Sequence, residues 1–339
     1  MSVTTVSTVM QEAVNNVPRN DIINGGLVVN QENQTAPADD AYTIGDLFLH
    51  VGEGTPVMSL ETDGPQGVRP WQKMVLDAND QGGLVYFMSN ADCQDYIANG
   101  KLSFGIQLKT TAATIANARI GILKWVGTAD AVTSDVVGTW ASDGTNPTLA
   151  TSWSYENTPA NIGLTTSWAR HTVEDITVDS NTTNIAIFVW TDDGTITASD
   201  VIGFSEWQCN PGSTVNDFSS GSTQEEALKV DYYLQRFERE AGTDRGSLCT
   251  AGAFSSTLAL GALRFRSRMR TRPTFSKLDV NAINFLNLGV DTTSSNIVVG
   301  EVNFDTAELQ VTLSGLTAGS GGTFRLVGEN DFVQFDSRL

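Results

Sequence analysis

The chain has 339 residues, of which 40% are hydrophobic and only 17% are charged. That length suits one large domain or two ordinary ones, and the composition excludes extensive disorder and coiled-coil architecture while favouring β structure. The formal charge of −19 excludes nucleic-acid or anionic-lipid binding through bulk charge. No run approaches the roughly 18 apolar residues of a membrane span and the first residues do not resemble a signal peptide, so we expect no membrane insertion and a product that begins in the cytosol.

The charge and the cysteines describe the chain further. Residues 1–223 carry 8 basic and 25 acidic side chains, a net charge of −17, whereas residues 224–339 carry 12 and 14, a net charge of −2. Two differently built regions are implied. The three cysteines, Cys93, Cys209 and Cys249, lack C-x-x-C spacing, so we expect buried free thiols and neither a disulfide framework nor a zinc site.

Residues 1–19 are predicted to form a short helical arm. Its apolar positions, separated by alternating steps of three and four, are Val3, Val6, Met10, Ala13 and Val17. This spacing is typical of a coiled-coil seam, but two heptads are too few to be stable alone. We therefore expect the arm to act at a subunit interface or in docking on a partner. The alternative is a frayed tail whose spacing is accidental.

Residues 20–221 consist of short β runs separated by Asn-Gly, Gly-Gly and Asp-Gly turns. Apolar runs at residues 27–29, 47–49, 120–123 and 185–190 are typical of strands. Residues 102–109 alternate Leu, Phe, Ile and Leu with Ser, Gly, Gln and Lys, so we expect one buried and one solvated face. This pattern predicts a sandwich of two sheets.

Residues 222–242 are predicted to form a connector helix. Ser222 or Thr223 with Glu225 or Glu226 matches a capping box. One helical face would carry the apolar residues Ala227, Val230, Tyr233, Leu234 and Phe237. Residues 243–339 return to β runs, so we expect a second, smaller β domain.

Five motifs then follow one another in a familiar order. They are NDIINGGLVVNQ at residues 20–31, YTIGDLF at 42–48, GKLSF at 100–104, TTSWAR at 165–170 and FSEWQCNPGS at 204–213. These motifs resemble the patterns N-x-L-I-N-G-x-x-x-V-x-Q, Y-T-x-D-R-W, G-K-x-x-T-x-S-F, T-x-x-W-x-R and V-Q-L-E-x-G-S. The patterns belong to bacteriophage tail-fibre and virion-surface proteins with a jelly-roll domain like that of carbohydrate-binding modules. The second motif departs by an extra residue and by Phe in place of Trp.

The resemblance extends to the end of the chain. DYYLQRFE at residues 231–238 resembles the family's C-Q-R-Y-F-E helix, MRTRPT at 269–274 its M-R-x-x-P-T strand, and FDSRL at 335–339 its D-A-E-L end. It implies an all-β fold: a jelly-roll β-sandwich and a smaller C-terminal β domain, joined by one helix and preceded by a short N-terminal helix. It also implies a virion protein that assembles as a homotrimer.

Aromatic residues in loop-like sequence are the candidate glycan contacts. Trp140, Trp153 and Tyr155 stand among Ser, Thr, Asn and Asp residues, and pyranose rings lie on aromatic planes while polar groups bind their hydroxyls. The alternative for these three is packing in the core. The tryptophans that we expect in the core are Trp125, Trp168, Trp190 and Trp207.

A catalytic reading has little support in the residue inventory. Only His50 and His171 could serve as imidazole bases, and no nucleophile-elbow or zinc-protease motif accompanies them. We therefore expect no enzymatic activity, although 39 acidic residues leave a two-carboxylate hydrolase as an alternative.

A structural calcium site is a further hypothesis. Asp39, Asp40, Asp46 and Glu206 come from the opening and closing strands, which sandwich modules bring together, and calcium prefers oxygen ligands. The alternative is a solvated acidic rim, because no EF-hand spacing is present.

Five arginines alternate near the start of the second β region. If this segment is a strand, one face carries Arg264, Arg266, Arg268, Arg270 and Arg272. Stacked like charges are costly unless anions meet them. We therefore expect a charged seam at a subunit or domain interface; binding to nucleic acid or an anionic glycan is the alternative.

Together these features predict a structural protein of a phage virion, assembled in the bacterial cytoplasm and in contact with itself and with other virion proteins. The leading function is a trimeric tail fibre or spike that attaches to host-cell glycans. Two alternatives remain open: a capsid decoration protein, or head fibre, with a structural role, and a carbohydrate-binding module of a cellular hydrolase.

Overall fold

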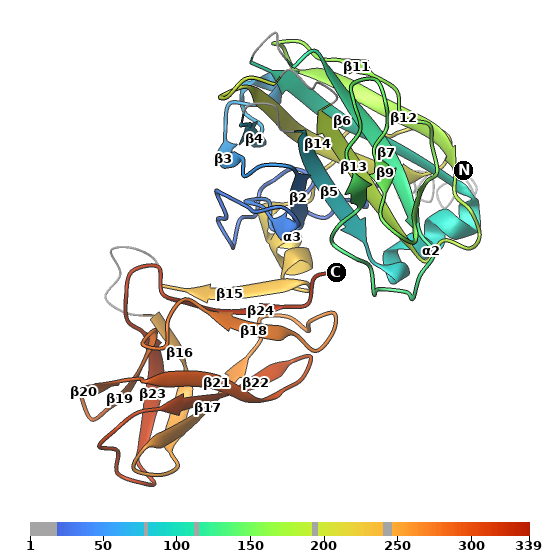
Figure 1. The fold of residues 1–339 in the computed structure, drawn as a ribbon. Helices are drawn as coiled ribbons and strands as arrows, with labels where there is room; N and C mark the ends of the chain where they lie inside the picture. The colour runs from blue at the N-terminus through green and yellow to red at the C-terminus, as the bar shows by residue number, and fades with distance from the viewer. Residues whose placement is uncertain (1–18, 78–80, 112–114, 192–195, 240–245) are drawn as a thin grey trace, which may run out of the picture. The chain divides into compact units, whose positions relative to one another are not determined.

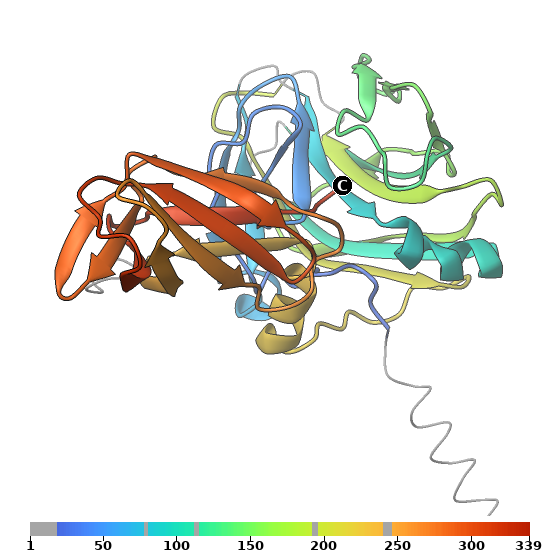
Figure 2. The ribbon, with the colours of Figure 1, turned by 90° about the horizontal axis from the view of Figure 1, so that it is seen from below.

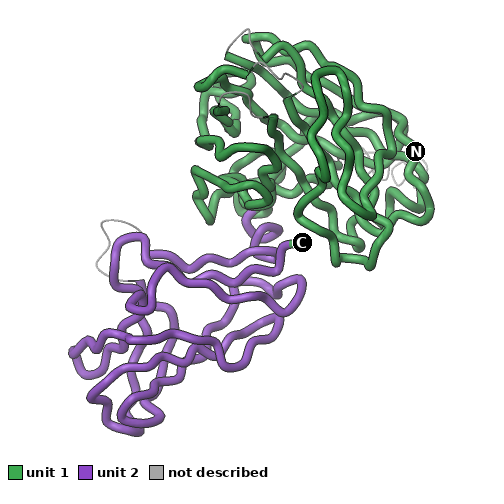
Figure 3. Tube along the Cα trace, in the orientation of Figure 1, with its two compact units in different colours: residues 1–226, 339 green, residues 227–338 purple. Residues whose placement is uncertain are grey.

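The computed structural model describes residues 19–77, 81–111, 115–191, 196–239 and 246–339. Two compact units divide the chain: unit 1 contains residues 1–226 and Leu339, and unit 2 contains residues 227–338 (Figure 3). Both units consist mainly of antiparallel strands (Figures 1 and 2), which confirms the predicted all-β class. The predicted N-terminal helix, with Val3, Val6, Met10, Ala13 and Val17, lies outside the described residues.

Unit 1 is a jelly-roll sandwich of two sheets, as predicted. Sheet A has the strand order β1-β2-β5-β13-β7-β10, with β11 also paired to β7. Its strands are β1 Ala41–Tyr42, β2 Phe48–Gly52, β5 Gly82–Met88, β13 Asn184–Thr191, β7 Asn117–Trp125, β10 Trp153–Tyr155 and β11 Ile162–Gly163. Sheet B has the order β12-β6-β14-β4-β3. Its strands are β12 Ala169–Thr177, β6 Lys101–Thr110, β14 Val201–Pro211, β4 Trp71–Val75 and β3 Val57–Glu61.

Over much of unit 1 the chain passes from one sheet to the other between consecutive strands, as jelly rolls do. From β4 to β7, and again from β12 to β14, consecutive strands alternate between sheets B and A. The unit also contains a separate pair of strands, β8 Val137–Thr139 and β9 Thr148–Leu149, a 3-10 helix, Pro65–Gly67, and helix α2, Asn90–Asn99. Residues 27–29, predicted as a strand, are not one; Leu27 has a φ of 54°, which no strand residue adopts.

The core between the two sheets follows the alternation that the sequence shows. Leu102, Phe104, Ile106 and Leu108 of β6 are all fully buried on the inner face of sheet B. Across the sandwich, the ring of Phe48 in sheet A lies 4.9 Å from that of Trp207 in sheet B, measured between centroids. Burial of these alternate side chains stabilises the pairing of the sheets, because each large apolar side chain contributes about 1.5–3 kcal/mol.

A second aromatic cluster lies on the outer face of sheet A. Phe87, Trp125, Phe188 and Trp190 project there, and residues 126–152 pass over them. We call residues 126–152 the covering segment. Its Val136 and Val137 are buried against the cluster, so this part of the outer face of sheet A is internal; the segment includes the two-stranded sheet of β8 and β9.

Helix α2, Asn90–Asn99, was not anticipated from the sequence, although its signals are present. Ser89 is the N-cap: its hydroxyl accepts from the Asp92 amide at 3.3 Å and donates to the Asp92 carboxylate at 2.6 Å. Gly100 ends the helix in the left-handed conformation, with a φ of 65°. The capping pair and the terminal glycine could have predicted this helix.

The predicted helix over residues 222–242 is much shorter in the structure. Helix α3 spans Thr223–Val230, and the boundary between the units falls within it. The capping box is present, since the Ser222 amide donates to the Glu225 carboxylate at 2.7 Å. Leu234–Glu238 instead form strand β15, which pairs with β24. The helical spacing of Tyr233, Leu234 and Phe237 was misleading because long-range strand pairing overrides local propensity.

Unit 2 is a smaller β domain with two sheets. A three-stranded sheet has the order β15-β24-β18, and a seven-stranded sheet the order β20-β19-β23-β16-β17-β22-β21. The remaining bounds are β16 Gly246–Ala253, β17 Leu258–Arg264, β18 Thr274–Lys277, β19 Ile283–Asn287, β20 Val290–Thr293, β21 Asn296–Val302, β22 Thr306–Thr312, β23 Gly321–Leu326 and β24 Phe332–Asp336. Its core includes the fully buried rings of Phe285, Phe324 and Phe335.

The arginine row is not a single strand face, so that part of the prediction is wrong. Strand β17 ends at Arg264, and Arg266, Arg268, Arg270 and Arg272 lie in the irregular connection to β18. Arg266 donates to the Asp231 carboxylate at 2.8 Å, and Arg270 donates to the Ser337 carbonyl at 2.9 Å. The guanidinium of Arg268 lies 4.9 Å from the centre of the Phe304 ring. The connection separates the charges, which removes the repulsion that a straight strand would impose.

Candidate functional site

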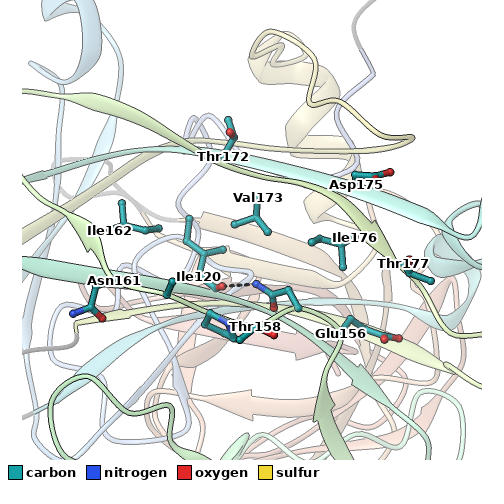
Figure 4. A pocket seen from close by; sticks show the side chains of 13 residues that line it. Ile120, Glu156, Thr158, Asn161, Ile162, Thr172, Val173, Asp175, Ile176 and Thr177 are labelled. Carbon is teal, nitrogen blue, oxygen red and sulfur yellow. Dashed lines mark hydrogen bonds between the residues drawn. The ribbon is translucent and has the colours of Figure 1, made fainter.

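A groove of about 520 Å³ lies in unit 1 between an edge of sheet A and an edge of sheet B (Figure 4). One wall is formed by β7, β11 and the loop between β10 and β11, and the other wall by β12. Pockets for small ligands usually have volumes of about 300–1,000 Å³, so the groove is large enough for a sugar unit or a similar molecule.

The floor of the groove is aliphatic. Ile120 of β7 is 1% exposed, and the half-buried side chains of Ile162, Val173 and Ile176 lie around it (Figure 4). The rim is polar and carries hydroxyl, amide and carboxylate groups. Its exposed members are Thr158, Asn161, Thr172, Asp175 and Thr177. A ligand in this groove would therefore meet a dry floor and a ring of hydrogen-bonding groups.

A β-bulge builds the wall on sheet B. The register of β12 against β6 shifts between Val173 and Ile176, and Asp175 adopts a φ of 58°. In a regular strand, residues three positions apart point to opposite faces; the extra residue turns Ile176 to the side of Val173. The Asp175 amide donates to the Ser103 hydroxyl at 3.1 Å, which anchors the bulge. The bulge thus supplies both aliphatic side chains of this wall.

Two polar side chains hold the wall on sheet A. The Asn157 carboxamide donates to the Ile120 carbonyl at 2.9 Å and accepts from the Ile122 amide at 2.8 Å. It therefore continues the pairing of β7 across the gap between β10 and β11. Arg119, 5% exposed, donates to the Asn161 amide oxygen at 2.7 Å, which leaves the Asn161 NH₂ group as a donor at the rim. Both contacts fix the loop before any ligand enters.

Cations balance the acidic groups of the groove. Lys101 pairs with the Asp175 carboxylate at 3.0 Å, and the Lys124 ammonium lies 4.0 Å from the Glu156 carboxylate. Glu156 also accepts from the Asp179 amide at 3.0 Å and the Thr182 hydroxyl at 3.1 Å. The groove is therefore polar without a strong field, which favours a neutral ligand with several hydroxyl groups over a cation.

The three predicted glycan contacts lie close together in the structure, but they pack on other side chains of unit 1. Trp153 is 6% exposed, and its ring centroid lies 5.1 Å from that of Trp125. The ring of Trp140 lies 6.0 Å from Phe188, and the Tyr155 hydroxyl donates to the Pro147 carbonyl at 3.0 Å. All three belong to the cluster on the outer face of sheet A. Trp153 is therefore buried, and Trp140 and Tyr155 are half-buried against the same cluster.

The four predicted calcium ligands are not assembled into one site. The Asp46 carboxylate accepts from the Gln31 amide at 2.8 Å and from the Glu32 amide at 2.9 Å, so it caps a turn. Glu206 lies 3.5 Å from Arg69, and Asp39 accepts from the Gly52 amide at 2.9 Å. Within the described ranges no group of three or more His, Cys, Asp or Glu side chains has the arrangement of a metal site.

Asp40, the fourth, has another environment. Burial raises its pKa to about 6, and the negative charges of Asp39 and Asp135 contribute to the rise. Burial likewise raises the pKa of Asp135, which belongs to the covering segment. This repulsion between carboxylates is expected to make the covering segment sensitive to pH.

The histidines and cysteines are placed largely as expected. His50 is 1% exposed, its Nδ1 lies 3.2 Å from the Ala38 carbonyl, and burial lowers its pKa. Burial also lowers the pKa of the half-buried His171. Cys93 and Cys209 are buried free thiols, as predicted, while the free thiol of Cys249 is only half-buried. None of the helices in the described part of the chain has the length and apolar character needed to cross a bilayer.

The residues that line the groove were not identified from the sequence as candidate ligand contacts. The run Asn157-Thr158-Pro159-Ala160-Asn161 follows the predicted aromatic platform directly and has the composition of a binding loop. That run was the available signal. No pattern in the sequence indicates that β12 contributes to the groove, because its bulge can be identified only from the register of β12 against β6.

Comparisons with known proteins give structural similarity alone. No protein-family model matches the sequence, and no curated protein matches it. The solved structures that resemble the fold include TmCBM61 in complex with β-1,4-galactotriose, at 13% identity, covering 57% of this chain and 99% of that one, with a TM-score of 0.33. Another is the CBM22-1 xylan-binding domain from Paenibacillus barcinonensis Xyn10C, at 9% identity, covering 51% and 87%, with a TM-score of 0.29.

A third is the family 11 carbohydrate-binding module from Clostridium thermocellum in complex with a β-1,3-1,4-mixed-linked tetrasaccharide. It is 10% identical, the match covers 50% of this chain and 91% of that one, and the TM-score is 0.28. These three structural neighbours are carbohydrate-binding modules with a jelly-roll fold. Similarity at this level does not identify a ligand for this chain.

Proposed function

We propose that unit 1 is a glycan-binding domain and that the groove between β11 and β12 holds a neutral saccharide without cleaving it. One observation carries this proposal: an aliphatic floor surrounded by hydroxyl, amide and carboxylate groups in a groove of about 520 Å³. A pyranose ring presents the matching surfaces, with C–H groups on its faces and hydroxyls around its edge. The half-buried Ile162 and Ile176 would meet a ring face, and Asn161 and Thr177 would meet the hydroxyls.

The wider role that we propose is that of a phage virion-surface protein that attaches to host glycans as a homotrimeric tail fibre or spike. The motif order from residues 20–31 to 335–339 supports this role, because it resembles that of virion-surface proteins. A capsid decoration protein is the second candidate, since a sandwich domain displayed on the shell could have a structural role that needs no ligand. The exposed Arg264, Arg268 and Arg272 are candidate subunit contacts in either assembly.

The groove is tested by blocking it at the rim. Thr158 is exposed and lines the groove, so Thr158→Trp should fill its mouth while leaving the core unchanged. Thr145, an exposed threonine elsewhere in unit 1, provides the matched control Thr145→Trp. A glycan array followed by calorimetry on the best neutral oligosaccharide should show binding to the wild type and the control and at least about a tenfold loss for Thr158→Trp. Equal binding by all three proteins would refute the groove as the site.

The virion role needs its own measurement. Immunogold labelling of intact particles with an antibody against unit 2 should place the protein on the tail if it is an attachment fibre. Labelling over the head would favour the decoration protein. Failure to find the protein on any particle would refute both virion roles and leave the module of a cellular hydrolase.

A further inference from the structure

A second polar surface of unit 1 lies on the outer face of sheet B. Strand register places Lys73 of β4, Gly203 of β14 and Lys109 of β6 side by side across three adjacent strands. Neighbouring strands lie about 4.8 Å apart, so the two lysines flank the glycine and can reach a common point above it. We call Lys73, Lys109, Trp71, Trp168 and Asp63 the lysine–indole face.

Gly203 allows two indoles to close over the sheet. A Cβ at this position would lie 2.9 Å from the Trp71 ring and 3.0 Å from the Trp168 ring, closer than side chains tolerate. The two rings meet edge to face, with centroids 5.4 Å apart and an interplanar angle of 78°. Trp168, expected in the core, is in fact half-buried here. The glycine thus creates a corner with two aromatic walls.

Lys109 is fixed in that corner. Its ammonium lies 4.0 Å from the centre of the Trp71 ring and 4.7 Å from the centre of the Trp168 ring. Contact with two aromatic faces holds the cation in one position without neutralising it. Because the Lys109 side chain is already held in one position, it loses little conformational entropy when it binds an anion. Such preorganisation favours binding.

The lysines of this face lack anionic partners in the structure. Among the described residues, neither Lys73 nor Lys109 forms an ion pair with a carboxylate within 4 Å. Asp63 is a carboxylate that interacts electrostatically with both lysines, and it accepts from the Trp71 indole at 2.8 Å. That hydrogen bond, together with the charges of Lys109 and Lys73, lowers the pKa of Asp63. Two lysines thus share one carboxylate that is already hydrogen-bonded to an indole.

The indole of Trp168 adds an unused donor. Its Nε1 is buried and has no hydrogen-bond partner in the described structure. Burying a donor without an acceptor costs about 1–3 kcal/mol. The lysine–indole face therefore carries two lysines and an indole donor without a partner, within residues 1–223, whose net charge is −17.

We propose that the lysine–indole face binds a single anionic group, a carboxylate or sulfate, carried on a saccharide. Lys73 and Lys109 pair with the anion, and the half-buried Trp168 ring offers an apolar surface to the sugar that carries it. The acidic surroundings select against nucleic acids and other dense polyanions, because the net charge repels them. This site is separate from the groove, and it extends the range of glycans beyond the neutral saccharide proposed there.

The test compares an acidic with a neutral oligosaccharide. Titration of the full chain with galacturonate trisaccharide, galactose trisaccharide and sodium acetate, followed by tryptophan fluorescence at low salt, should show the acidic saccharide binding at least about tenfold more tightly than either of the others. Equal affinity for the two trisaccharides would overturn the proposal. Acetate binding as tightly as the acidic saccharide would reduce the site to one for simple ions and would also overturn it.

Charge variants locate the site. Lys109→Gln and Lys73→Gln should each weaken binding of galacturonate about tenfold, whereas Lys109→Arg should retain most of it. The control is Lys229→Gln, an exposed lysine of helix α3 that belongs to neither site. Circular dichroism melting establishes that each variant is folded. Unchanged binding by folded Lys109→Gln and Lys73→Gln would refute the face.

The groove and the face can fail independently. Thr158→Trp should abolish binding of the neutral saccharide and leave galacturonate binding intact, whereas Lys109→Gln should do the reverse. Loss of galacturonate binding in Thr158→Trp would assign the acidic ligand to the groove and refute the lysine–indole face.

Discussion

The outer faces of the two sheets of unit 1 both carry tryptophans, and the chain treats them in opposite ways. On sheet A, Trp125, Trp153 and Trp190 belong to one cluster, and the covering segment adds Val136 and Val137 to it. On sheet B, Trp71 and Trp168 enclose a lysine, and Trp168 is only half-buried. The comparison shows that an aromatic cluster on a sheet face is buried where a loop with apolar side chains packs on it. Where a lysine packs on the rings instead, the face remains partly exposed and polar.

Substitution of the buried tryptophan should have the largest effect. Trp153→Ala removes a ring packed between Trp125 and Phe87 and is expected to lower the free energy of unfolding by about 3–5 kcal/mol. Trp168→Ala should cost only about 1–2 kcal/mol because its ring is half-buried. Urea denaturation measures both, and equal losses would show that the two faces do not differ as described.

A larger residue at Gly203 should break the corner on sheet B. Gly203→Val places side-chain atoms against both indoles and is expected to destabilise unit 1 by about 1–3 kcal/mol. Gly163→Ala is the control, since nothing lies within 4 Å of a Cβ there. Thermal melting should separate the two variants. A neutral Gly203→Val would mean that Trp71 and Trp168 do not close over the glycine.

The covering segment of sheet A should respond to pH through Asp40. Its pKa in the folded protein, about 6, lies above the ordinary value of 3.8, so the folded state binds this proton more tightly than the unfolded chain. The resulting stability is present below about pH 4 and is lost as the pH rises through 6. Asp40→Asn should remove this dependence and stabilise the protein by about 1 kcal/mol at pH 8, a modest gain because solvent screens the partly exposed group. Melting temperatures at pH 4.5 and pH 8 measure the change; the same pH dependence in both proteins would contradict it.

The smallest effect is expected from the cation on sheet B. Lys109→Gln removes an ammonium from two aromatic faces and should lower stability by about 0.5–1 kcal/mol. Lys73→Gln, which has no such contact, should leave stability within about 0.5 kcal/mol of the wild type. Guanidinium is unsuitable because it screens charge, so urea is the denaturant. Equal losses for the two variants would contradict the proposed position of Lys109.

Much of the fold could be predicted from local patterns. The alternation over residues 102–109 reports the buried face of β6, because side chains of a strand point to opposite sides in turn. The capping box of Ser222 and Glu225 marks the start of α3, because the cap is a local contact. The all-β class followed from composition and from these runs together.

The sites could not be predicted in the same way. Trp153 and Tyr155 stand in polar, loop-like sequence, and nothing local indicates that sheet A lies beneath them. The same limit explains β15, where residues 234–238 have helical spacing but pair with β24, almost a hundred residues later in the chain. The bulge that forms one wall of the groove is likewise set by the pairing of β12 with β6, which are distant in the sequence.

The sequence by itself therefore determined which side chains alternate, where helices begin and how the charge is distributed. Only the tertiary structure decided which aromatic surfaces are covered, which lysines meet across Gly203, and where Val173 and Ile176 face the same way. The physical reason is that periodicity and capping depend on neighbours along the chain, whereas burial and register depend on partners brought together from distant positions.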